Sequence, residues 1–187
     1  WTFVKPKKWR NGRQANPRQP EGEVHRQAQV NRDESTLRSP EEIRTEYNRV
    51  LYQCGNDSAC TALKKVVREM QPKPITLGIC LGIGTFDPPD GGWDTKRRTY
   101  LQLWAFITMI EALEERQDGG RIECFFQEPL FTKPDRAFIE SLSPSFSVLE
   151  SPEGFEKVDN ATFLYGLHLY RPIYAKALAR AAPSIFV

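Results

Sequence analysis

The stretch Ile75-Thr-Leu-Gly-Ile-Cys-Leu-Gly-Ile-Gly-Thr-Phe86 decides the fold of this chain. It begins as a short apolar run rich in β-branched residues, which is typical of a strand buried on both faces. It then breaks at Gly82 and Gly84, where a backbone needs conformational freedom or close approach to a ligand. After an insert, a long apolar helix is predicted from Tyr100 to Glu115. A buried strand, a glycine turn and a helix open a doubly wound α/β unit, with a ligand crevice at the strand's carboxyl end.

The rest of the chain repeats the alternation of short apolar runs and helical patterns. Further strands are predicted near residues 122–126, 146–149, 162–167 and 184–187, with helical segments between them. The predicted fold class is therefore α/β, a Rossmann-like and mostly parallel sheet of about five strands flanked by helices. The final strand stops on apolar residues where a loop is expected, so we expect a C-terminal truncation after Val187.

An N-terminal helical extension is predicted before this core, over residues 39–71. Ser39-Pro-Glu-Glu42 combines a capping serine, a first-turn proline and an acid three residues after the cap, which is a strong helix start. Nothing in the helical pair indicates chemistry. We therefore divide the chain into an arm of residues 1–38 and one domain of residues 39–187, whose Rossmann-like core is 75–187.

The arm is basic, with nine Lys and Arg residues against four Asp and Glu residues. Its polar composition predicts a largely flexible segment, in which Trp1–Val4 is the exception that is able to dock on the body. The cluster Lys5-Pro-Lys-Lys-Trp-Arg10 indicates nuclear import or nucleic-acid contact, and a solvated tail is the simpler interpretation.

The composition also indicates where in the cell the protein is expected. No apolar run reaches the length of about 18 residues that a membrane span needs, and no secretory leader opens the chain. The four cysteines form no metal pattern, and we expect Cys80 and Cys124 to be small core residues. Cys54 and Cys60 are expected to be reduced thiols. The expected location is the cytoplasm, the nucleus or both.

Residues that follow separate strands are expected to meet at the carboxyl edge of the sheet. Glu128 follows the second strand, where doubly wound folds often hold a ribose hydroxyl, and the alternative is a carboxylate that caps nearby backbone. His168 follows the fourth strand and is open to three interpretations: a general base, an iron ligand or a hydrogen-bonded structural residue. The candidate ligand-binding residues are Gly82, Gly84, Thr85, Phe86, Arg98, Gln102, Glu128, Phe131, Thr132 and His168.

The basic residues Lys96 to Arg98 are predicted to precede the long helix, where they either face an anionic ligand or form a solvated turn. No Ser/His/Asp or Cys/His set, phosphate loop or zinc pattern is recognisable, so no catalytic residue is assigned. No metal is expected unless haem is bound, in which case His168 is the candidate ligand.

Four segments carry a family resemblance: Leu81-Gly-Ile-Gly-Thr-Phe86, Tyr100-Leu-Gln-Leu-Trp-Ala-Phe106, Gln127-Glu-Pro-Leu-Phe-Thr132 and Thr162-Phe-Leu-Tyr-Gly-Leu-His168. Through them the chain resembles the SRR-like domain family, named for sensitivity to red light reduced. The resemblance extends from Trp1 to about Val187. It implies circadian-clock input, transcriptional regulation and haem metabolism, with haem binding in some members, and it implies no established reaction.

The chain departs from the family pattern at two places. Glu128 stands where the family usually has aspartate, a change that keeps the carboxylate. Leu167, His168 and Leu169 stand where the family usually reads Pro-His-Cys, which weakens any transfer of thiolate haem ligation to this chain.

Three functions remain open from the sequence. The first is a regulatory protein of the SRR-like kind that holds a small metabolite at the carboxyl edge. The second is an enzyme that uses a nucleotide-type cofactor there, such as S-adenosylmethionine or a dinucleotide. The third is a protein-interaction module with a vestigial pocket, which predicts that Phe86 and Phe131 fill the edge.

Overall fold

The computed structural model describes residues 32–54, 58–70 and 73–187, and the predicted docking segment Trp1–Val4 lies outside them. None of the helices in these residues is long and apolar enough to span a membrane. The elements, in chain order, are η1 (Glu34–Thr36), α2 (Pro40–Cys54), α3 (Ser58–Glu69), β1 (Leu77–Leu81), α4 (Trp93–Arg116), β2 (Glu123–Gln127), α5 (Lys133–Glu140), β3 (Phe146–Val148), α6 (Glu153–Glu156), β4 (Thr162–Tyr165), α7 (Arg171–Ala177) and β5 (Ile185–Phe186).

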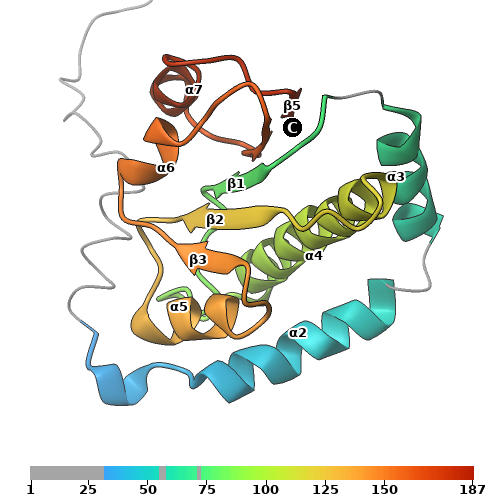
Figure 1. Ribbon diagram of the computed structural model, residues 1–187. Coiled ribbons are helices and arrows are strands. Elements are labelled where there is room, and N and C mark those ends of the chain that lie inside the picture. Colours follow the sequence, from blue (N-terminus) through green and yellow to red (C-terminus); the bar gives the residue numbers. More distant parts are fainter. Residues whose placement is uncertain (1–31, 55–57, 71–72) are drawn as a thin grey trace, which may run out of the picture.

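The strands form one five-stranded sheet in the order β3-β2-β1-β4-β5, and every pairing is parallel (Figure 1). This is the strand order of a doubly wound sheet with its switch point between β1 and β4, so the predicted α/β class is confirmed. The register pairs Leu81 with Gln127 and Cys80 with Tyr165. The segments that follow β1, β2 and β4 therefore leave the sheet side by side at one edge.

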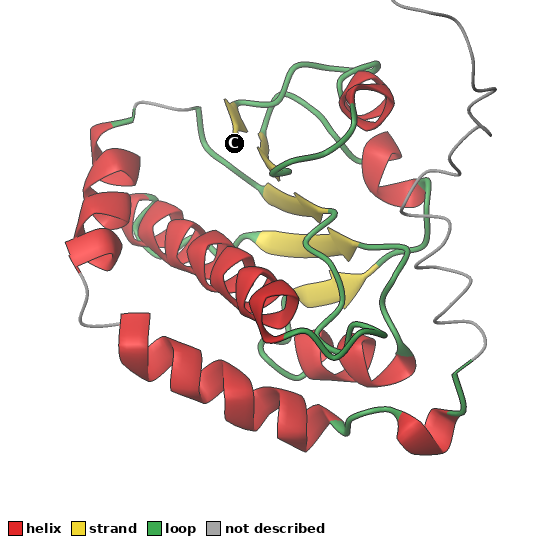
Figure 2. Ribbon diagram, turned by 180° about the vertical axis from the view of Figure 1, so that it is seen from behind, coloured by secondary structure: helices red, strands yellow, loops and turns green. Residues whose placement is uncertain are grey.

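The two faces of the sheet have separate cores. Side chains alternate along β1, so Cys80 belongs to the large cluster under α4 and α5, whereas Ile79 and Leu81 belong to a small cluster with Ala177 of α7. Figure 2, seen from behind, shows the long helix α4 in front of the strands. The helical extension, α2 and α3, packs on α4 and α5 from outside.

Side chains of helix α4 occupy the space beside β1 that a side chain at Gly78 would need. A methyl group at Gly78 would lie 2.7 Å from Cδ1 of Ile110, 3.1 Å from Sγ of Cys124 and 3.2 Å from Cζ of Phe106. The glycine therefore allows Ile110 and Phe106, the two of these residues that lie on α4, to contact the strand directly.

The start of α4 corrects one prediction. The helix begins at Trp93, directly after Gly92, and not at Tyr100. The proline- and glycine-rich insert is shorter than its composition indicates, because Asp94 already occupies the first helical turn. Lys96 to Arg98 thus lie within α4 and do not precede it.

The predicted start of α2 is confirmed by its hydrogen bonds. The Glu42 N–H donates to Oγ of Ser39 at 3.2 Å, and the Ser39 N–H donates to Oε2 of Glu42 at 2.8 Å. Just before it, the described end of the arm is attached to the body. The Arg32 guanidinium donates to the backbone oxygen and to Oδ2 of Asp87, both at 2.8 Å.

Gly78→Ala should lower the free energy of unfolding by about 1–3 kcal/mol, because the added methyl overpacks the contact between β1 and α4. The measurement is urea denaturation followed by circular dichroism. Gly120→Ala is the matched control, since its methyl would lie 3.4 Å from the nearest atom, Gln117 O. Equal stability of the two variants would contradict this account of the β1–α4 contact.

Candidate functional site

The turn after β1 has a backbone that only glycine adopts without strain. Gly82 and Gly84 have φ angles of 68° and 86°, which lie in the left-handed region. The Gly82 N–H donates to the backbone oxygen of Gln127 at 3.1 Å, so this turn extends the pairing of β1 with β2. A methyl group at Gly84 would lie 3.0 Å from Oγ1 of Thr99 on α4. The glycine pair is therefore explained by close packing between neighbouring elements.

Glu128 binds the same turn through its side chain. Its Oε2 accepts the Gly84 N–H at 2.8 Å, and its Oε1 accepts the Leu130 N–H at 2.9 Å. The residue is only 7% exposed. Burial raises the pKa of Glu128, the two N–H donors oppose that rise, and the nearby Asp135 charge adds to it. Of the two interpretations of Glu128, its contacts match the carboxylate that caps backbone.

Asp135 is a second buried carboxylate at this edge, and it was not among the predicted site residues. Its Oδ2 accepts Oγ1–H of Thr85 at 2.7 Å and the Thr132 N–H at 2.8 Å, and its Oδ1 accepts the Phe86 N–H at 3.3 Å. Burial raises its pKa, and these hydrogen bonds oppose the rise. Thr132 and Asp135 form a capping box at the start of α5. That box is visible in the sequence as a helix start, but the link to Thr85 is not.

Leu169 occupies the space above the glycine turn. A methyl group at Gly82 would overlap Cδ2 of Leu169, and one at Gly166 would lie 2.8 Å from its Cδ1. His168, the preceding residue, is exposed and has a φ of 57°, which is uncommon for a residue other than glycine. The structure thus brings the turn after β4 to the glycine turn through Leu169, while His168 lies at the surface.

Phe86 and Phe131 lie in the core. Phe86 has no exposed surface, and its ring stacks on Phe131 with centroids 5.9 Å apart. Phe86 also contacts Tyr100 and Phe138, with centroid distances of 5.2 and 5.0 Å. These rings join the turn after β1 to α4 and α5.

Two predicted residues of α4 differ in their surroundings. The Oε1 atom of Gln102 is buried and accepts no hydrogen bond within the described part of the chain. Gln102 lies three residues after Thr99, so both residues lie on neighbouring positions of one helix face. Arg98 is exposed and, in residues 32–54, 58–70 and 73–187, has neither a hydrogen bond nor an ion pair. The structure does not bring Arg98 into the contacts of Glu128.

Metal binding and thiol chemistry have little support in the described residues. Across the ranges that the structure describes, no cluster of three or more His, Cys, Asp or Glu side chains is arranged to hold a metal ion. Cys80 and Cys124 are buried core residues, as predicted, and burial raises the pKa of both thiols. Cys54 and Cys60 are free thiols.

Glu128→Gln should change how stability depends on pH. The folded protein binds the Glu128 proton more tightly than the unfolded chain does, since burial raises this pKa above its ordinary value of 4.5. The contribution of Glu128 is therefore complete below pH 4.5 and is lost as the pH rises through the raised pKa. The stability of the variant relative to the unmodified protein should therefore rise as the pH increases from 4.5 through the raised pKa of Glu128. Urea denaturation at a series of pH values measures the free energy of unfolding of both proteins. A constant difference between them at every pH would refute this prediction.

A comparison with protein families identifies the domain that carries this edge. The family model of the SRR1 domain matches residues 59–187, which is more than half of the chain and includes the whole sheet with its carboxyl edge. No curated protein and no solved structure matches the chain. The match confirms the resemblance seen in the four sequence segments. The chain belongs to the SRR1 domain family.

Proposed function

We propose that this SRR1-domain chain is a regulatory protein that binds a small metabolite at the carboxyl edge of its sheet. The ligand lies between the glycine turn, the turn after β4 and the first half of α4. Circadian-clock input, transcription or haem metabolism is the setting implied by the family resemblance. Action in the cytoplasm or nucleus, a protein partner and nucleic-acid contact through the basic arm belong to the same proposal.

The buried Oε1 atom of Gln102 is the observation that carries the proposal. Leaving a buried acceptor without a partner costs about 1–3 kcal/mol, and native structures contain few such atoms. Gln102 accepts no hydrogen bond within the described residues, and it lies one helical turn from Thr99, which contacts Gly84. A ligand with an N–H or O–H donor at this edge supplies the missing partner.

Binding is favoured over catalysis because the acids at this edge are already engaged. Both oxygens of Glu128 accept backbone N–H groups, and both oxygens of Asp135 accept donors from Thr85, Phe86 and Thr132. Neither carboxylate is positioned as a free general base. This also disfavours the enzyme with a dinucleotide, whose ribose hydroxyl needs a free carboxylate at the end of β2.

Leu169 gives a physical route from ligand binding to regulation. A ligand that approaches Gly82 displaces this side chain, because Leu169 covers the glycine. The Leu169 N–H donates to Oη of Tyr174 at 3.1 Å, and that hydroxyl donates to the Gly166 oxygen at 2.9 Å. Tyr174 lies on α7 and contacts Phe186 of β5 with ring centroids 5.7 Å apart. Ligand binding is thereby coupled to α7 and β5.

The second candidate function is a protein-interaction module, which is favoured by the side chains that fill the carboxyl edge. Leu169 covers Gly82, and Phe86 stacks on Phe131, so side chains already fill much of the edge. In this case the SRR1 domain acts through its surface and binds no metabolite. Haem is the third possibility to test, with the exposed His168 as iron ligand.

A ligand survey with hemin, S-adenosylmethionine and NAD tests metabolite binding by thermal melting and absorption. A compound that binds only the folded protein stabilises it by about 2.7 kcal/mol at about 100 times its dissociation constant. Gln102→Met should abolish that stabilisation, while the ligand-free variant keeps its stability or gains up to about 1 kcal/mol. If the compound still raises the melting temperature of Gln102→Met, the role of Gln102 is refuted.

Gln117→Met is the matched control, since Gln117 is also a glutamine of the α4 region but has both amide atoms engaged. Its Oε1 accepts the Ile75 N–H at 2.5 Å, and its Nε2 donates to the Ile75 oxygen at 2.9 Å. This variant should lose about 1–3 kcal/mol of stability, and any compound that stabilises the unmodified protein should stabilise it equally. A hemin Soret shift that survives His168→Ala removes His168 as the iron ligand.

Leu169→Ala separates the two candidate functions. The ligand-free variant should lose about 1–3 kcal/mol, because a packed side chain is truncated over Gly82 and Gly166. If the edge binds a metabolite, the effective survey compound should stabilise this variant more than the unmodified protein. If none of the three compounds stabilises either protein, the interaction module is supported and the metabolite proposal fails for these ligand classes.

A further inference from the structure

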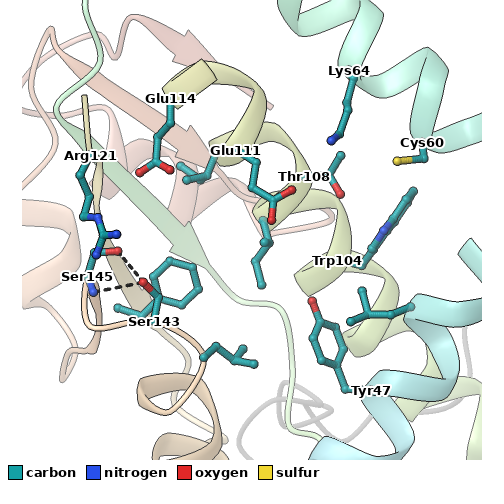
Figure 3. Close-up of a pocket in the computed structure, with 15 residues that line it drawn as sticks. Tyr47, Cys60, Lys64, Trp104, Thr108, Glu111, Glu114, Arg121, Ser143 and Ser145 are labelled. Carbon is teal, nitrogen blue, oxygen red and sulfur yellow. Dashed lines mark hydrogen bonds between the residues drawn. The ribbon is translucent and has the colours of Figure 1, made fainter. Parts of the chain in front are cut away.

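A groove on the outer side of α4 lies apart from the carboxyl edge. It is bounded by α2, α3, the second half of α4 and the segment that joins α5 to β3 (Figure 3). Its volume is about 560 Å³, within the range of about 300–1,000 Å³ that is typical of small-molecule sites. None of the residues that line it belongs to the glycine turn or to the turn after β4.

The groove has an apolar wall and two hydroxyl groups that are accessible from it. Trp104, Ile107 and Phe146 provide apolar and aromatic surface. Tyr47 and Thr108 are each only 4% exposed and line the groove, and neither side chain has a hydrogen bond within residues 32–54, 58–70 and 73–187. Both hydroxyl oxygens are accessible from the groove, so they are available to hydrogen-bond with the polar atoms of a ligand.

Glu111 gives the groove a carboxylate that is not engaged elsewhere. Its neighbours on α4 are occupied: Glu114 accepts the Ile122 N–H at 2.8 Å, and Glu115 pairs with Arg68 at 3.1 Å and with Lys64 at 4.0 Å. Glu111 forms neither a hydrogen bond nor an ion pair with any residue that the structure describes. Figure 3 shows its carboxylate and the Tyr47 hydroxyl pointing into the same space.

Glu111 is an exposed residue, and partial burial raises its pKa; the charge of Lys64 opposes this rise, and the charges of Glu115 and Glu114 add to it. A carboxylate in such surroundings gains from a cation that replaces lost hydration. The Lys64 ammonium lowers the pKa of Glu111 through its charge but forms no direct ion pair with it; its ion pair is with Glu115, at 4.0 Å.

We propose that this groove is a binding site for a small organic cation, an ammonium group carried on a flat apolar body. The ammonium binds the Glu111 carboxylate and donates to the hydroxyl groups of Tyr47 or Thr108. The apolar body packs on Ile107 and Phe146 and against the ring of Trp104. This site goes beyond the metabolite site proposed at the carboxyl edge and does not depend on it.

The test uses three probes that share one ring system and differ in charge: tryptamine, 3-methylindole and indole-3-acetate. Isothermal titration calorimetry on the full chain should find tighter binding of tryptamine than of the neutral and anionic probes. Glu111→Gln should weaken tryptamine binding by about tenfold or more and leave 3-methylindole binding unchanged, since only the charged contact is removed. Tyr47→Phe and Thr108→Val should each weaken tryptamine binding by a smaller factor.

Glu69→Gln is the matched control, because it removes an equal charge from an exposed residue of α3 that does not line the groove. It should bind tryptamine as the unmodified protein does, and so should Gln102→Met at the carboxyl edge. The proposal is overturned if tryptamine binds no better than the other two probes, if Glu111→Gln binds it equally well, or if no probe binds. Thermal melting of each variant confirms that a loss of binding is not a loss of folding.

Discussion

Two buried carboxylates hold the carboxyl edge of this sheet together. Glu128 accepts N–H groups from Gly84 and Leu130, and Asp135 accepts donors from Thr85 and Phe86. The Glu128–Gly84 and Asp135–Thr85 bonds join residues 44 and 50 positions apart in the chain. The position of the glycine turn is therefore set by the neighbouring β2–α5 connection and needs no bound group.

The same hydrogen bonds change what the edge is able to recognise. A doubly wound domain that binds a dinucleotide directs the acid after its second strand toward a ribose hydroxyl. Here the oxygens of Glu128 face backbone N–H groups, and the buried Asp135 binds protein donors as well. The edge thus has the topology of a nucleotide crevice, but its acids are used to hold protein segments. The buried polar atom near this edge that has no partner in the described residues is a neutral amide oxygen, that of Gln102.

Local patterns were sufficient to predict the sheet but not the contacts at its edge. The apolar run before Gly82 and the glycine turn indicated a buried parallel strand, and parallel strands necessarily bring Glu128 to the same edge. The helix start at Trp93 was missed because prolines and glycines dominate the preceding composition. The link from Asp135 to Thr85 was missed because capping patterns report only local partners. That Leu169 covers Gly82 depends on the left-handed backbone of His168, which no local pattern of a histidine indicates.

Helix α4 is the common support of the carboxyl edge and the outer groove. Gln102 and Glu111 are nine residues apart, which corresponds to about 14 Å along the helix axis. Between them, Phe106 and Ile110 pack directly on β1, because Gly78 leaves no side chain in the way. A shift of α4 at either region would have to lift these side chains off the sheet, and close-packed cores resist such motion. Under the proposed metabolite binding, a signal from the carboxyl edge would therefore leave through the turn after β4 and through α7, where the Tyr174 hydroxyl holds the turn, and not through the long helix.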